Sequence, residues 1–499
     1  MVQLKKLANQ TIIYGGTTII GRLLNYLLVP FHTYIFLNPQ SYGVVGEMYA
    51  WVALFMVLLT YGMETAFFRF SSMEENKQLV FSSTFWTISI TSTLFIVFGL
   101  LFSQSIADLL QYSRHPEYIR WFVIILSLDA LSTIPFARLR AENRPIRFAA
   151  IKIFNILTTV FFNVFFLWFC PMMIRNGIGT AFFSSIYNPE VGVGYIFISN
   201  LIASCLQMLL LLGYCKGLKF NIHWPLIKRM LKYAMPLLIL GLAGIVNETI
   251  DRILIKNLSS DSLDTAMYNV GVYSACFKIA VIMSLFIQAF RYSAEPFFFA
   301  QYKEKDAKEA YSMVMTYFVI VCSIIFLATT LYLDFIKYFV SKPYHEGLHI
   351  VPPLLLAYMM LGVVYNLSIW YKLTGQTKYG AYISMGGALI TLTVNFLLIP
   401  QIGYTGAAIA HLITYLCMMI ASYALGQKFY PIAYNLKKIA FYVAVSVGMF
   451  ILSYYIIPFD LFGSNATMIK TVFNTGLLLL YIYIIYKKEF ITLKKVLHS

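Results

Sequence analysis

Apolar stretches of about twenty residues recur from one end of this chain to the other, and about 20 apolar residues are what an α-helix needs to cross a bilayer. Strand-like alternation is absent, so helices rather than a barrel must satisfy the backbone in lipid. Hydrophobic residues make up 60% of the chain and charged residues only 12%. We therefore predict an all-α polytopic membrane protein of about fourteen transmembrane helices. The predicted spans are 9–34, 43–66, 79–103, 117–138, 148–170, 193–214, 233–256, 270–298, 311–336, 350–372, 379–400, 404–427, 439–458 and 468–486.

The basic residues between these spans alternate in number and predict the orientation. One set of alternating segments carries 25 lysines and arginines and the opposite set carries six. Because cytoplasmic loops are enriched in basic residues, both termini are predicted in the cytoplasm of a cell (inner) membrane, with an even number of spans. The net charge of +16 thus reflects topology and does not indicate nucleic acid. The start has two lysines but no small-residue cleavage site, so we expect the first span to be retained.

A basic segment, 216–232, separates six spans from the remainder. Trp224-Pro225 is expected to open a short amphipathic helix that lies on the inner membrane surface. A weak internal repeat supports the division, because an offset of 228 residues aligns Tyr42-Gly43 with Val270-Gly271. Many transporters are built from such duplicated bundles. The predicted domains are a six-helix bundle (1–215), a cytoplasmic linker (216–232), a second six-helix bundle (233–430) and an extra helix pair with a tail (431–499).

Four basic side chains lie deep inside predicted spans, where a charge is costly and usually faces protein or water. These residues are Arg22, Arg252, Lys278 and Arg291. Arg22 has no acid within one helical turn. Arg252 follows Glu248 by four residues, and Arg291 precedes Glu295 by four, so both could be neutralised on their own helix. The other interpretation is that these cations line a polar cavity for charged cargo or a coupling ion.

The segment from Gly21 to Ser72 resembles the polysaccharide transport branch of the MOP flippase superfamily. The shared features are Pro30, the loop Pro39-Gln40-Ser41-Tyr42-Gly43, Gly62 and Arg69. Asp251-Arg252 followed by Val270-Gly271-Val272-Tyr273-Ser274 is similar in the second half. The resemblance implies two six-helix bundles with alternating access, plus a last helix pair like that of the lipid II flippases.

The implied cargo is an oligosaccharide on undecaprenyl diphosphate, moved to the periplasmic or outer leaflet for O-antigen, capsule or exopolysaccharide synthesis. Membrane lipids, a polysaccharide polymerase and glycosyltransferases are the implied partners. Arginine suits a diphosphate because its planar fork matches phosphate oxygens and stays charged when buried. The resemblance extends this role to Arg22 and Arg252, and by span alone to Lys278 and Arg291. Asn25 and Asn247 are candidates for further polar contacts.

Acidic residues in the spans are candidates for coupling to Na⁺ or H⁺, because a buried carboxylate can exchange a proton or join carbonyl groups around sodium. The alternative is that they pair with the buried arginines. Glu47, near an outer end, could simply be solvated. The remaining candidates are Glu248, Asp251, Asp129 and Glu64.

Two other functions fit parts of the sequence. A multidrug exporter of the related MATE class shares the bundle plan, but cationic drugs call for an acidic cavity and this chain has at least as many buried cations. A membrane glycan polymerase or glycosyltransferase needs a sizeable catalytic loop. The sequence has no Gly-rich phosphate loop, paired catalytic carboxylates or metal-ligand cluster. We therefore expect no catalytic residues, no metal and no cofactor beyond a coupling ion.

Overall fold

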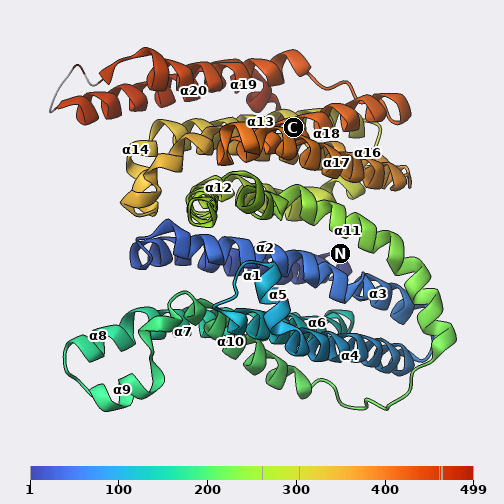
Figure 1. The fold of residues 1–499 in the computed structure, drawn as a ribbon. Helices are drawn as coiled ribbons and strands as arrows, with labels where there is room; N and C mark the ends of the chain where they lie inside the picture. The colour runs from blue at the N-terminus through green and yellow to red at the C-terminus, as the bar shows by residue number, and fades with distance from the viewer. Residues whose placement is uncertain (1, 261, 303, 460, 462–464, 498–499) are drawn as a thin grey trace. The chain divides into compact units, whose positions relative to one another are not determined.

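The computed structural model describes residues 2–260, 262–302, 304–459, 461 and 465–497, with side chains between residues 16 and 489, residue 18 excepted. Within this part of the chain all regular structure is helical (Figure 1). Thirteen helices among the described residues are long and apolar enough to cross a membrane, and they coincide with thirteen of the predicted spans. The first predicted span, 9–34, falls within a further helix, α1 (Val2–Ile35). The predicted fold class is confirmed.

The chain divides into two compact units, Met1–Ser274 and Ala275–Ser499. The boundary lies inside one long helix, α12 (Leu263–Gln301). The first unit therefore contains the first six predicted spans, the seventh, and the start of the eighth. The domain limits predicted from the sequence stay a prediction.

The first unit is organised around α6 (Pro116–Ala141), which packs against α4 (Lys77–Leu101) and α10 (Gly194–Leu212). Two thirds (67%) of the apolar window of α6 is buried, against 28% for α4. Helix α1 packs on α7 (Pro145–Val164), which continues as a π-helical turn (Phe165–Phe169) into α8 (Cys170–Arg175). The remaining helices are α5 (Ser103–Leu109), α9 (Thr180–Ile186) and α11 (Trp224–Leu258).

The second predicted span is broken into two helices, α2 (Pro39–Thr60) and α3 (Met63–Met73). Tyr61 and Gly62 between them have φ of 32° and 72°, a left-handed conformation that ends the hydrogen-bond ladder of α2. A break at membrane depth is tolerated where protein covers it. Here a Cβ built on Gly62 would lie 3.0 Å from the carbonyl oxygen of Ala234 on α11. Two residues later α11 contains Pro236, which cannot donate to the preceding turn.

The prediction of a short helix on the membrane surface at Trp224-Pro225 is wrong about what surrounds the helix. Helix α11 does begin at Trp224, but it continues without interruption to Leu258 (Figure 1). Leu226, Ile227 and Met230 are at most 2% exposed and pack in one hydrophobic cluster with side chains of α3 and α4. The apolar face inferred from the sequence is therefore real, but it is covered by protein rather than by lipid.

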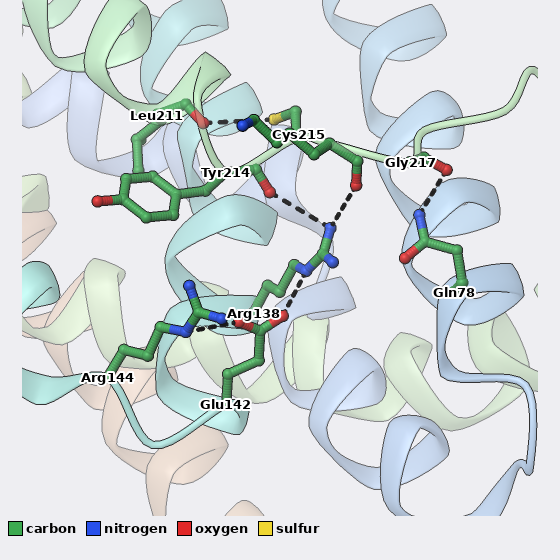
Figure 2. A network of polar contacts seen from close by, with 9 residues as sticks. Gln78, Arg138, Glu142, Arg144, Leu211, Tyr214, Cys215 and Gly217 are labelled. Carbon is green, nitrogen blue, oxygen red and sulfur yellow. Dashed lines mark hydrogen bonds and ion pairs between the residues drawn. The ribbon is translucent and has the colours of Figure 1, made fainter.

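The chain from Gly213 to His223, which precedes α11, is held by polar contacts to α4 and α6 (Figure 2). Arg138 donates to the carbonyl oxygens of Tyr214 at 3.3 Å and Lys216 at 3.2 Å, and it pairs with Glu142 at 2.7 Å. Gln78 donates to the carbonyl oxygen of Gly217 at 2.7 Å. Arg138, counted in the sequence as a cytoplasmic topology signal, thus also fixes the connection between two predicted bundles.

The second unit contains the rest of α12 and the helices that follow it. Helix α13 packs on α15, α19 and α20, while α18 packs on α15 and α17. On the last helix pair, Glu489 of α20 is 1% exposed and accepts from Lys438 and Tyr442 of α19. These helices are α13 (Ala307–Leu331), α14 (Leu333–Ile336), α15 (Val351–Leu367), α16 (Ile369–Leu373), α17 (Lys378–Ile402), α18 (Tyr404–Phe429), α19 (Leu436–Ile451) and α20 (Ala466–Leu497).

Candidate functional site

Arg252 lies near the C-terminal end of α11 in a buried polar cluster. Its Nη1 donates to Asp251 Oδ1 at 2.8 Å and to the carbonyl oxygen of Glu248 at 3.2 Å. The hydroxyl of Tyr273, on α12, also donates to Asp251, and the guanidinium carbon lies 5.6 Å from the centre of the Tyr273 ring. Arg252 is 8% exposed and Asp251 1% exposed. The cation is therefore neutralised and positioned at the contact of two helices.

The carboxylate that pairs with Arg252 is not the one suggested by helical spacing. Glu248 is exposed, and only its backbone carbonyl meets Arg252. The side chain of Arg252 points back along the helix toward the preceding turn, as helical side chains do, and there it meets a carbonyl while Glu248 points outward. Asp251 thus serves as the counter-ion, and Asn247, one turn earlier, is 4% exposed.

Arg22 and Asn25 lie on the exposed surface of α1. Among the described residues, no ion pair or hydrogen bond is made by the Arg22 guanidinium. The neighbouring Gly21 is buried against Ile156 of α7, so the helix is anchored beside an uncompensated cation. The sequence likewise places no acid within one helical turn of Arg22.

In the second unit, Arg291 lies half-buried on α12 with its guanidinium carbon 4.0 Å from the centre of the Tyr365 ring. The expected pair with Glu295 is wrong, because Glu295 binds Lys372 of α16 instead. A small cavity lies beside these side chains, and the Oδ1 atom of Asn366, itself 4% exposed, has no hydrogen-bond partner there. Lys278 is half-buried on the same helix.

The candidate coupling carboxylates differ in their surroundings. Asp129 of α6 accepts from Ser204 of α10 at 2.8 Å, and the ammonium of the half-buried Lys152 on α7 acts on it electrostatically. Glu64 pairs with Arg140 at 2.9 Å, and both side chains are more than two fifths exposed (41% and 44%). The burial on which the candidacy of Glu64 depended is therefore not found. Glu248 is exposed as well, whereas Asp129 is half-buried and Asp251 is buried.

One buried cluster was missed by the sequence analysis. Glu47 of α2 and Lys256 of α11 form an ion pair with an Nζ–Oε2 distance of 2.9 Å and side chains at most 2% exposed. Lys256 is the last residue of a predicted span, and Glu47 was expected to be solvated or to take part in ion coupling. No helical spacing links Glu47 and Lys256, because they lie on different helices, 209 residues apart in the sequence.

The chemistry that these residues can offer is recognition of an anion rather than bond making. An arginine over an aromatic ring keeps its charge and leaves its donors free for oxygen ligands. Arg291 is such a cation in the second unit. In the first unit, the exposed Arg22 guanidinium makes no ion pair or hydrogen bond among the described residues. Arg252 is held by Asp251, so it can bind an anion only as part of an ion pair.

Comparison with known proteins identifies the family. The sequence profile of the polysaccharide biosynthesis protein family matches residues 7–300. The chain belongs to this family. No protein of curated function matches the sequence.

Solved structures of the MOP superfamily share the fold of this polysaccharide biosynthesis protein. A structure of the lipid II flippase MurJ in an inward closed conformation is 15% identical, covers 96% of this chain and 99% of its own, and has a TM-score of 0.65. An inward-facing MATE multidrug resistance transporter is 13% identical, covers 81% and 93%, and has a TM-score of 0.61. An outward-facing MATE transporter, also 13% identical, covers 84% and 95% with a TM-score of 0.58.

Proposed function

We propose that this protein is a flippase that moves an undecaprenyl-diphosphate-linked oligosaccharide from the cytoplasmic to the outer leaflet by alternating access. It would serve the synthesis of a surface polysaccharide such as O-antigen, capsule or exopolysaccharide, in a cell (inner) membrane with both termini in the cytoplasm. The observation that carries the proposal is the family match over residues 7–300. The fold shared with a lipid II flippase supports it. The role is transport, not catalysis.

Arg22 in the first unit and Arg291 in the second are each proposed to bind phosphate oxygens of the cargo. Each is a cation without an ion-pair partner among the described residues, and each lies on a spanning helix where an uncompensated charge is expensive. Such a charge is expected to be retained for a ligand. Lys278, Asn25 and Asn247 remain proposed polar contacts, and Arg252 is proposed to contribute through its pair with Asp251. Asp129 and Asp251 remain the proposed sites of coupling to Na⁺ or H⁺.

The length of the structural likeness favours a flippase over a multidrug exporter. The flippase structure covers 96% of the chain and the MATE structures 81–88%. A match over 96% of the chain has to include most of α19 and α20, whereas a match over 81–88% leaves enough residues unmatched to omit most of both helices. A cationic dye efflux assay in cells that carry or lack the gene tests the exporter alternative.

The experiment is a complementation test in the source organism with its own gene deleted. Arg22→Ala and Arg291→Ala should each abolish surface polysaccharide and cause a lipid-linked oligosaccharide, detected by mass spectrometry, to accumulate. Arg→Lys at either position should restore part of the export, because the charge survives but the bidentate fork does not. Arg175→Ala, an exposed arginine at the end of α8, is the matched control. Full export by both alanine variants would refute the anion site.

A further inference from the structure

The buried ion pair between Glu47 and Lys256 joins three segments of the first unit. Glu47 accepts from Lys256, from the Tyr112 hydroxyl and, at 3.2 Å, from Trp51 Nε1. Lys256 also donates to the carbonyl oxygen of Leu110 and lies 4.2 Å from the centre of the Tyr112 ring. All charges in the cluster are therefore matched. The three segments are α2, the last turn of α11, and the connection between α5 and α6.

The cluster lies at the end of the spans that the basic residues predict to be outside. Tyr112 lies outside the membrane-spanning helices, and burial, followed by the charge of Glu47, raises its pKa well above the ordinary value. It therefore remains protonated at physiological pH and keeps donating to Glu47.

Glycines of the two repeats meet beside this cluster. A Cβ built on Gly43 of α2 would lie 3.1 Å from the backbone nitrogen of Gly271 on α12, and one built on Gly271 would lie 3.1 Å from the nitrogen of Gly43. These two glycines are the positions that the 228-residue offset aligns. One turn deeper, a Cβ on Gly46 would collide with Ser274. The outer part of α2 is thus closed against both the first and the second helix of the second repeat.

Burial of an ion pair is a poor way to make a permanent contact. Removing both charges from water costs several kcal/mol per ion, and apolar side chains of similar volume usually hold a fixed interface at least as well. The balance changes when the interface has to separate, because exposed carboxylate and ammonium groups regain their hydration whereas apolar groups do not. A buried Glu–Lys pair therefore suits a contact that forms and breaks.

Span two is broken, and the continuous helix α11 contains a proline, at a common level. Span two breaks at Tyr61-Gly62, and α11 contains Pro236 next to that break. On the inner side of the break, Met63, Phe67 and Met230 are buried in one hydrophobic cluster. Helix α3 and the inner part of α11 can stay packed while α2 and the outer part of α11 move. A few residues at the ends of helices are enough to absorb the change in backbone angles that such a movement requires.

We propose that Glu47, Lys256 and Tyr112 form an outer latch, which holds the outer ends of α2 and α11 together and has to open before cargo can leave toward the outside. Glu47, Lys256 and Tyr112 are positioning residues that need not touch the cargo. The proposal rests on the proposed function for the existence of a transport cycle, but the opening of the outer latch can be measured without any cargo.

The test measures access from outside to a cysteine placed behind the outer latch. Ser274→Cys is the reporter, because Ser274 is 2% exposed and faces Gly46. The other cysteines are replaced, except Cys322 of α13, which is 0% exposed and reports loss of folding. Cells are treated with a membrane-impermeant maleimide. Lys256→Met should increase the labelling rate of Ser274→Cys at least tenfold, and Tyr112→Phe severalfold, while Cys322 stays unlabelled. Arg114→Met, at an exposed arginine in the same connection, should leave the rate unchanged.

If Lys256→Met leaves the labelling rate of Ser274→Cys unchanged while Cys322 stays unlabelled, the outer latch is refuted and the ion pair is a permanent structural contact. If Lys256→Met also exposes Cys322, that variant is unfolded and Tyr112→Phe, which loses only one hydrogen bond, becomes the test. A labelling rate of Ser274→Cys in Tyr112→Phe equal to that of the parent would then overturn the proposal. The same strains separate the two proposals. Faster labelling of Ser274→Cys in Lys256→Met would support the outer latch. If the deletion strain at the same time accumulates no lipid-linked oligosaccharide, the proposed cargo is wrong.

Discussion

Replacement of Gly271 by alanine should drive the N-terminal parts of α2 and α12 apart. The new methyl carbon would lie 3.1 Å from the backbone nitrogen of Gly43 and closer than 3.0 Å to the carbonyl oxygen of Pro39, whereas ordinary contacts begin at 3.4 Å. Both obstacles are backbone atoms, so no side-chain rotation relieves them and one helix has to move. Overpacking of this kind costs about 1–3 kcal/mol.

That cost applies only while the two helices are in contact, so it changes the equilibrium between contact and separation. A free-energy difference of 1–3 kcal/mol corresponds to about a 5- to 150-fold change in an equilibrium constant. If the separated state of the parent is populated at about 1%, within the usual range for a minor conformer, Gly271→Ala should raise it to about 5–60%.

The measurement is a spin-label distance distribution between cysteines introduced at Gln40 and Asp264, near the starts of α2 and α12, in a cysteine-free background. Gly271→Ala should add a longer-distance population that the parent shows only weakly. Gly244→Ala on α11 is the matched control, because a Cβ built there meets no atom within 4 Å. An unchanged distribution together with a lowered melting temperature would refute the reasoning, since the strain would then be absorbed within the closed contact.

Two further predictions concern ion pairs in different environments. The double variant Glu47→Leu with Lys256→Met should have a melting temperature closer to that of the parent than Lys256→Met alone. The single change leaves a buried carboxylate unpaired, at a cost of about 3–5 kcal/mol. A double variant that melts at a lower temperature than the single variant would contradict this. A double-mutant cycle on the exposed Glu64–Arg140 pair should give a coupling energy below about 1 kcal/mol, measured by thermal unfolding in detergent, and a larger value would show that the pair is shielded from water.

The spans could be predicted because lipid imposes a length and a composition on every helix that crosses it. The breaks inside the spans could not be predicted to the same degree. Gly62 was noted as a motif residue, yet an isolated glycine in an apolar helix is compatible with a continuous span. The left-handed φ of Tyr61 and Gly62 depends on the contact with α11, which belongs to a distant part of the chain. The partner of the apolar face at Leu226 was unpredictable for the same reason.

The sequence predicts which charged residues lie in the spans, but it does not predict which of them pair. Spacing of four residues suggested Glu248 for Arg252 and Glu295 for Arg291, yet Asp251 and Lys372 are the partners that Arg252 and Glu295 respectively have. Local spacing only makes a pair geometrically accessible, while the low dielectric of the surroundings makes pairing obligatory wherever a tertiary partner can reach. The exceptional charges are therefore those that remain unpaired after folding. Arg22 and Arg291 meet this criterion among the described residues, and so they, rather than the more conspicuous Arg252, are the first residues to test for anion binding.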